Sequence, residues 1–337
     1  MPALRTEVTE IVTGLGTLGA PTVDDALDGG PPAALRNVDA ATWDRLREAH
    51  RDGGHRGEFL AAWNNGRAFL RSTDGLRDRV PAIVEWKGGH RDPGDDVVPS
   101  DLRIDHVYLV SCKYLSRVLH NAAPWALFDR GLAGAAGPRQ DASWFDAVAP
   151  VEHQQLYQVV RRTHAAGLEL PEQVTALSSA QRKELRLAIP RDWSPECAEA
   201  YRRLAVTASE RSAARWREQL SSPRERVAML WRLLRLGAAP YFVLGTGPRD
   251  SLRLRVATPW DWRAAYDLRS FDVEAEGTGQ ARVRWAAVVR DRDAARDVEV
   301  AGHVEIRWSH GRFGGLPEAK VYLDTPHQRV PGYFPLV

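Results

Sequence analysis

The residues with the clearest chemical potential lie in one segment, Val98 to Tyr114. Asp101 begins a short apolar stretch, and Ser111 and Lys113 end the next one. The dipeptide Asp105–His106 between these stretches is typical of a tight turn, so the segment predicts a hairpin. A carboxylate can hold a divalent cation, and a lysine can interact with charge on an attacking water or a phosphate. The spacing therefore favours phosphate chemistry at the open end of this hairpin.

The second strand of the hairpin decides which side chains share a face. Side chains alternate along a strand, so Ser111 and Lys113 point to one side and Cys112 points into the core. Asp101 lies across the hairpin from them. The acid, the hydroxyl and the lysine are therefore expected to lie close together.

Further carboxylates surround this set in the sequence. Glu58 lies near the first turn of a helix predicted over residues 55–64, and Glu85 lies in a buried strand predicted over residues 81–86. Asp105 lies in the turn itself. Metal-dependent phosphodiester hydrolysis needs carboxylates that converge on Mg²⁺ and a cation that assists the water. These three acids are the candidates to complete such a site.

This arrangement resembles the PD-(D/E)xK nuclease superfamily, to which many restriction endonucleases belong. Pro99-Ser100-Asp101 stands for the PD element with one residue inserted, and Ser111-Cys112-Lys113 stands for the (D/E)xK element. The resemblance covers about residues 55–130. The sequence departs from the pattern at Ser111, where an acid is usual, and a serine hydroxyl is a weaker metal ligand than a carboxylate.

The resemblance implies roles for particular residues. The catalytic set would be Asp101, Ser111, Lys113 and Glu58. The ligands of Mg²⁺ or Mn²⁺ would be Asp101, Glu58 and the backbone carbonyl of Cys112, with Glu85 or Asp105 compensating for the serine. Lys113 would orient the attacking water.

The function that the resemblance implies is a Mg²⁺-dependent endonuclease acting on DNA, of restriction or antiviral (phage) defence type. Its partners would be duplex DNA and either a second copy of the chain or the other subunits of a defence complex. One alternative is a catalytically inactive nucleic-acid-binding or assembly subunit that kept the fold and lost the acid at position 111. Another is an interaction protein that binds no nucleic acid.

The (D/E)xK spacing also occurs at two other places in the sequence, Glu85–Lys87 and Glu318–Lys320. In a chain of 337 residues with 44 acids, such a match is expected by chance. The Asp101–Lys113 set ranks first because acid, hairpin, lysine and a helix predicted over residues 114–132 come in the right order. The pair at 318 and 320 is better explained as a surface cross-strand pair. In the plainest alternative, Asp101 caps a turn and Lys113 is solvated.

Other catalytic signatures are weak or missing from the sequence. His303, Glu305 and His310 offer three donors for a metal on a strand and turn, without a fourth. The sequence holds no phosphate-binding Gly-rich loop, no dinucleotide fingerprint and no nucleophile elbow. ATPase, dehydrogenase and serine hydrolase functions therefore lack their usual sequence support.

Composition limits the class of protein. The 46 basic and 44 acidic residues give a net charge of +2, which argues against a non-specific nucleic-acid coat. No apolar run is long enough to span a membrane. Two cysteines cannot build a disulfide framework, and the N-terminal residues lack a secretory pattern, so a cytoplasmic location is expected.

Hydrophobic periodicity predicts an α/β (α+β) protein in three consecutive parts. Residues 1–137 would form a restriction-endonuclease-like α/β core. Residues 138–238 are dominated by helical signals, including Ser-Pro helix starts at Ser194 and Ser222. Residues 239–337 alternate with a period of two and predict a mainly antiparallel sheet, which is either its own domain or a continuation of the first sheet.

Overall fold

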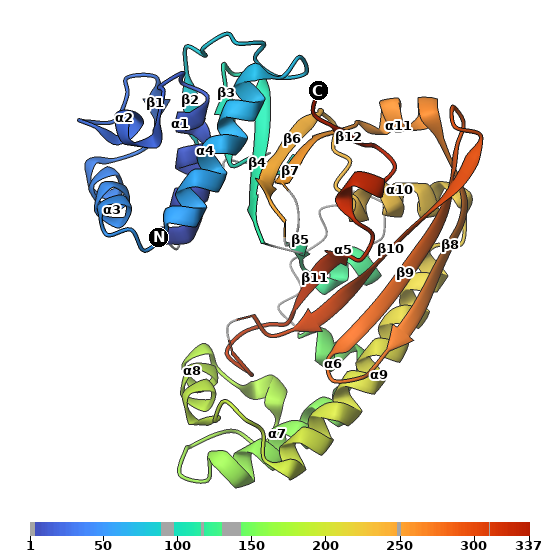
Figure 1. Cartoon of the computed structure of the whole chain (residues 1–337). Coiled ribbons are helices and arrows are strands. Elements are labelled where there is room, and N and C mark those ends of the chain that lie inside the picture. Colours follow the sequence, from blue (N-terminus) through green and yellow to red (C-terminus); the bar gives the residue numbers. More distant parts are fainter. Residues whose placement is uncertain (1–3, 89–97, 116–117, 130–142, 248–250, 310) are drawn as a thin grey trace. The chain divides into compact units, whose positions relative to one another are not determined.

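Strand β4 (Tyr108–Tyr114), the second strand of the predicted hairpin, lies in the middle of a seven-stranded sheet. The computed structural model describes residues 4–88, 98–115, 118–129, 143–247, 251–309 and 311–337. These residues form two compact units, which are drawn in Figure 1. Unit 1 comprises residues 1–117, 234–266 and 326–337, and unit 2 comprises residues 118–233 and 267–325.

The sheet of unit 1 is mixed. Its strands, in spatial order, are β1 (Leu35–Arg36), β2 (Val84–Trp86), β3 (Leu102–Ile104), β4, β6 (Tyr241–Thr246), β7 (Ser251–Val256) and β12 (Tyr333–Pro335). The pairs β1–β2 and β4–β6 are parallel, and the other neighbours are antiparallel. Residues 105–107 join β3 to β4 in a tight turn, in which Asp105 and His106 have φ of 49° and 59° and the amide of Val107 donates to the carbonyl of Ile104 at 3.1 Å. The predicted hairpin is confirmed.

One face of this sheet packs against α1 (Leu4–Gly16) and α4 (Arg56–Arg71), which lie side by side (Figure 1). Alternate residues of the central strands join the helices in one buried cluster, among them Val110, Cys112, Phe242 and Leu244. Because side chains alternate, Ser111 and Lys113 belong to the opposite face. The remaining helices of this unit are α2 (Val23–Leu27), α3 (Ala40–Arg51), α11 (Pro259–Ala265) and the 3₁₀ turn η2 (His327–Arg329).

Helix α4 is longer than the sequence predicts, because Asn65–Gly66 is typical of a helix end but the helix continues to Arg71. Gly66 lies inside α4, where the backbones of α4 and α1 approach closely. A Cβ atom at Gly66 would lie 2.1 Å from the carbonyl oxygen of Thr13. Gly66 therefore serves helix packing and does not end α4.

The helix predicted over residues 114–132 is also wrong. Strand β4 continues to Tyr114, and Val118–Ala122 forms β5, which pairs antiparallel with β11 (Glu318–Leu323). A short helix, α5 (Pro124–Phe128), begins at the proline, which suits a first helical position. Pairing with a strand about two hundred residues away overrides the local helical pattern.

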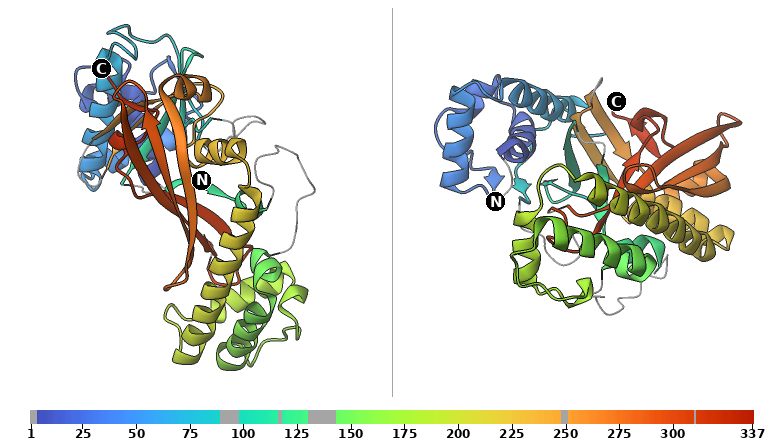
Figure 2. Two further views of the ribbon diagram at one scale, coloured as in Figure 1. Left: turned by 90° about the vertical axis from the view of Figure 1, so that its right-hand side faces the viewer. Right: turned by 90° about the horizontal axis from the view of Figure 1, so that it is seen from below.

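Unit 2 combines the predicted middle helices with an antiparallel sheet. The helices are α5, α6 (Trp144–Val148), α7 (Pro150–His164), α8 (Ser179–Ala188), α9 (Pro195–Gln219), α10 (Pro223–Leu233) and the 3₁₀ turn η1 (Val174–Ala176). The strands, in spatial order, are β5, β11, β10 (Arg296–Arg307), β9 (Ala281–Asp291) and β8 (Tyr266–Glu276). Helix α9 runs along this sheet and contacts β9 (Figure 2).

Both predicted serine caps are confirmed. The hydroxyl of Ser194 accepts a hydrogen bond from the amide of Cys197 at the start of α9, and Ser222 caps α10 with Glu225 as the reciprocal partner. In β9 and β10 buried and more exposed residues largely alternate, which gives the sheet one apolar and one polar face. The polar face carries Arg282, His303, Glu305 and Arg307.

The division into units differs from the three consecutive parts 1–137, 138–238 and 239–337 that the sequence suggests. Within the last part, β6, β7 and β12 continue the sheet of unit 1, whereas β8 to β11 build the sheet of unit 2. Residues 239–337 therefore partly continue the first sheet and partly form a sheet of their own. The chain leaves unit 1 after β4 and returns to it twice, a path that strand periodicity does not encode. The coarse prediction of a mixed α/β protein is confirmed.

Within the described ranges, none of the helices is both long and apolar enough to cross a membrane.

Candidate active site

Asp101 immediately precedes β3 and lies between the end of β2 and the middle of β4. Its backbone amide donates a hydrogen bond to the carbonyl of Val110 at 2.8 Å, and its carbonyl accepts one from the amide of Lys87 at 2.9 Å. The strand partners of Asp101 thus include the last residue of the rival Glu85-Trp86-Lys87 motif. The sheet brings both predicted motifs to the same place.

The carboxylate of Asp101 binds the segment that immediately precedes Lys113. It accepts a hydrogen bond from the amide of Cys112 at 2.6 Å and one from the hydroxyl of Ser111 at 3.2 Å. Ser111 is only 2% exposed. Ser111 therefore helps to fix Asp101, and the predicted neighbourhood of Asp101 and Ser111 is present.

Lys113 is half-buried on the same face of β4 as Ser111. Its neighbour in the parallel strand β6 is Gly245. A Cβ atom at position 245 would lie 2.2 Å from the carbonyl oxygen of Lys113, so the two backbones approach more closely than a side chain allows. This glycine sets the position of the lysine backbone.

His327 belongs to the surroundings of Lys113, although nothing in the local sequence singles it out. Burial lowers the pKa of His327, and the positive charge of Lys113 lowers it further. The histidine is therefore neutral at pH 7 and can accept a proton. It lies in η2, shortly before β12, and reaches this place because the end of the chain returns to unit 1.

Cys112 faces α1, on the other side of the sheet from Lys113. Burial raises the pKa of its thiol well above the ordinary value, and the carboxylates of Asp101 and Glu10 raise it further. The thiol is therefore protonated and unsuited to act as a nucleophile. Its backbone amide binds Asp101, and the role of its carbonyl as a metal ligand stays a prediction.

Glu85 is engaged elsewhere. Its two carboxylate oxygens accept hydrogen bonds from Arg103, its neighbour on β3, at 2.6 and 2.8 Å, and His106 lies 3.2 Å away. The hydrogen bonds with Arg103 lower the pKa of Glu85 against the effect of burial. A metal ion at this carboxylate would have to compete with a bidentate arginine.

Asp105 stabilises the hairpin turn. Its carboxylate accepts hydrogen bonds from Arg79 at 2.6 Å and from the amides of Ala82 and Ile83 at 2.8 and 3.2 Å. Burial opposes its charge, but these hydrogen bonds outweigh burial, and the pKa of Asp105 is lowered. Its position in the turn puts it at the opposite end of β3 from Asp101.

Glu58 lies in the first turn of α4, as predicted, but its partners are basic residues. Arg5 lies 3.3 Å from its carboxylate and His55 lies 3.6 Å away. The guanidinium of Arg5 also lies over the ring of Tyr114, the last residue of β4, at 5.6 Å. Glu58 is thus connected to the end of β4 through an arginine.

The described residues provide few side chains that could bind a metal ion. Across these residues there is no group of three or more His, Cys, Asp or Glu side chains arranged to hold one. Of the four predicted carboxylates, Asp101 is the one that contacts Ser111 and the amide of Cys112. Mg²⁺ is commonly held by one or two carboxylates together with substrate phosphates and water. The residues fit such a shared site and do not form a closed protein cage.

The rival pair Glu318–Lys320 lies on β11 in unit 2. There Glu318 pairs with Arg307 and Lys320 pairs with Glu305 in the register of β10. Each residue thus faces an opposite charge on the neighbouring strand, as expected for a cross-strand pair. This pair belongs to the polar face of the second sheet.

No protein-family model, no curated protein and no solved structure matches the chain.

Proposed function

We propose that this protein is a metal-dependent endonuclease that hydrolyses phosphodiester bonds in DNA. The observation that supports the proposal is the contact between the Asp101 carboxylate and the Ser111–Cys112 segment, which immediately precedes Lys113. It brings the acid to the segment next to the lysine, at one end of the hairpin. A restriction or phage-defence role, with duplex DNA as substrate and a dimer or defence complex as assembly, follows from the sequence resemblance.

In this proposal Asp101 holds Mg²⁺ or Mn²⁺, together with phosphate oxygens of the substrate and water. The bound metal would polarise the phosphate and lower the pKa of a bound water. Lys113 orients the attacking water and offsets the charge on the phosphate. A bond forms between the water oxygen and phosphorus while the bond to one sugar oxygen breaks. The proton of the water passes to solvent, and solvent returns a proton to the departing oxygen.

The test is cleavage of supercoiled plasmid by the full chain with Mg²⁺, with Mn²⁺ and with EDTA. We expect nicking by the wild type with metal, no nicking with EDTA, and a loss of about 100-fold or more in Lys113→Ala. Lys183→Ala, which changes a lysine on α8 in unit 2, is the matched control and should cleave like the wild type. Nicking by Lys113→Ala at the wild-type rate would refute the proposal.

The alternative is a nuclease-like subunit that binds nucleic acid without cutting it. It is favoured by the ion pairs that engage Glu58 and Glu85, and by the serine at position 111. This alternative predicts DNA binding that weakens steeply with salt, because phosphate contacts release counterions. It also predicts no cleavage with any divalent metal. A mobility-shift titration beside the cleavage assay separates the two functions.

A further inference from the structure

Unit 2 contains a cavity of about 570 Å³ that has no part in the proposed active site. It lies between the start of α9, the turn between β8 and β9, and the segment that follows β10. Its volume is in the range of pockets that bind small molecules. Three aromatic and three basic side chains dominate its lining: Trp193, Tyr201, Trp308, Arg202, Arg307 and Arg312. The lining residues in the described part of the chain include no Asp or Glu.

The three arginines of the lining differ in their carboxylate partners, and none of those carboxylates belongs to the described lining of the cavity. Glu199 pairs with both Arg202 and Arg203. Arg312 makes no ion pair with a carboxylate in the described part of the chain. Its guanidinium donates to the carbonyl of Pro190 at 3.0 Å and stacks on Trp193, 3.7 Å from the ring centroid. The cavity therefore presents excess positive charge.

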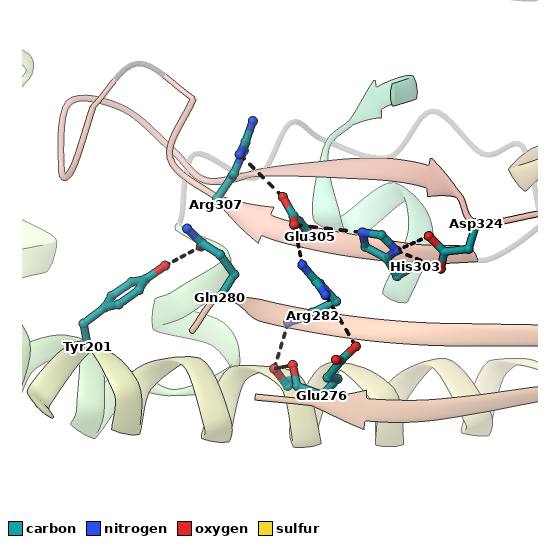
Figure 3. A network of polar contacts seen from close by, with 9 residues as sticks. Tyr201, Glu276, Gln280, Arg282, His303, Glu305, Arg307 and Asp324 are labelled. Atoms are coloured by element: carbon teal, nitrogen blue, oxygen red, sulfur yellow. Dashed lines mark hydrogen bonds and ion pairs between the residues drawn. The ribbon is translucent and has the colours of Figure 1, made fainter. Parts of the chain in front are cut away.

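Arg307 is held by a network of polar contacts on β9 and β10 (Figure 3). Glu305, which is 8% exposed, lies 3.5 Å from Arg307 and 2.9 Å from Arg282. His303 lies 3.9 Å from Glu305 and 3.0 Å from Asp324. Arg282 also lies 3.7 Å from Glu276, and Glu305 positions Arg307. His303 and Glu305, considered above as metal donors, act in this network, and His310 lies outside the described residues.

The aromatic residues and Gln280 give the cavity a second recognition element. The ring of Tyr201 lies 5.9 Å from that of Trp193 and 6.3 Å from that of Trp308. Burial raises the pKa of Tyr201 to about 12, so its hydroxyl remains protonated and donates to the side-chain oxygen of Gln280 at 2.5 Å. Figure 3 shows these two side chains facing each other. The amide nitrogen of Gln280 is left as a donor to a ligand.

We propose that this cavity binds a nucleotide, with the base against the aromatic side chains and the phosphate at the arginines. Aromatic rings and guanidinium planes both stack on bases, and arginine is the preferred side chain for phosphate. Gln280 would donate to an acceptor on the edge of the base. The nucleotide is either free or one unit of a single-stranded nucleic acid, since both present the same chemistry. This proposal does not depend on the proposed endonuclease activity.

Isothermal titration of the full chain tests the proposal with four probes: dAMP, deoxyadenosine, inorganic phosphate and the single strand (dA)₆. We expect dAMP to bind at least tenfold more tightly than deoxyadenosine or phosphate. A tenfold or greater advantage of (dA)₆ over dAMP would identify a nucleic-acid strand as the ligand, and equal affinity would identify a free nucleotide. Equal binding of phosphate and dAMP, or no heat from dAMP at millimolar concentration, would overturn the proposal.

Variants locate the binding in this cavity. Trp193→Ala and Arg312→Gln should each weaken dAMP binding at least tenfold, and Trp193→Phe should retain most of it because a ring remains. Arg296→Gln, an equal charge change at an exposed position of β10, is the matched control and should bind like the wild type. Thermal unfolding of each variant verifies that it is folded. Wild-type affinity in folded Trp193→Ala would also overturn the proposal.

Discussion

The carboxylate of Asp101 accepts a hydrogen bond from the backbone amide of Cys112 at 2.6 Å, across the open end of the β3–β4 hairpin. This contact fixes the acid beside the strand that carries Ser111 and Lys113. Asp101 also accepts a hydrogen bond from the Ser111 hydroxyl. A substitution at position 111 would therefore change metal binding most directly.

Ser111→Glu should make the thermal stability of the protein depend on bound metal. The new carboxylate would lie beside Asp101 in a buried place, where like charges destabilise each other. We therefore expect a lower melting temperature in EDTA than for the wild type. A metal that bridges the two acids would restore stability, by about 2.7 kcal/mol at a concentration about 100 times its Kd. Thermal unfolding with and without Mg²⁺ measures this. Ser111→Ala is the control and should gain nothing from Mg²⁺ relative to the wild type.

Gly245→Ala should destabilise the sheet of unit 1. Its Cβ would lie 2.2 Å from the carbonyl oxygen and 2.8 Å from the Cβ of Lys113, and neither atom can move without shifting β4. Overpacking of this kind costs about 1–3 kcal/mol or more. Urea unfolding gives the loss of stability directly. An unchanged midpoint would contradict the close approach of β4 and β6 at this glycine.

Two glycines of α4 should respond in opposite directions to alanine. A Cβ atom at Gly57 would meet no other atom within 4 Å, so Gly57→Ala should stabilise by up to about 1 kcal/mol through helix propensity. Gly66→Ala gains the same propensity, but its Cβ would meet the Thr13 carbonyl oxygen at 2.1 Å. Its net effect should be a loss of about 1–2 kcal/mol. Chemical denaturation of the two variants side by side tests the close packing of α1 and α4.

The pKa of His327 should report its distance from Lys113. Burial and the Lys113 charge lower this pKa below the ordinary 6.5, so the unfolded chain binds a proton more readily than the folded one. The stability that results is fully present above pH 6.5 and is lost as the pH falls below it. In Lys113→Met the pKa of His327 should rise, as followed by NMR of the imidazole protons. Lys183→Met is the control, and the same rise there would rule out a local effect.

The hairpin could be predicted from the sequence because its determinants are local. The apolar stretches on either side of Asp105–His106, and the alternation of Ser111, Cys112 and Lys113, require no information from elsewhere in the chain. The serine caps of α9 and α10 are local in the same sense, because a cap involves residues three positions apart. These elements appear in the structure where the pattern predicts them.

The errors occur where distant partners decide the local structure. Gly66 of α4 is typical of a helix end, yet it marks the contact between two helices. Residues 118–122 have helical spacing but pair with β11 as a strand. Glu58 and Glu85 have the right residue type for metal binding, but Arg5 and Arg103 neutralise them, and no local pattern reveals those arginines as partners.

By itself the sequence determined a mixed α/β protein, the hairpin, and the proximity of Asp101 to the Ser111–Lys113 segment. Only the tertiary structure decided that β6, β7 and β12 extend the first sheet, that Gly245 faces Lys113, and that His327 comes near the lysine. The physical reason is the range of the interactions. Turns, caps and alternation act over a few residues, whereas sheet order and close backbone contacts depend on burial between segments far apart in the chain.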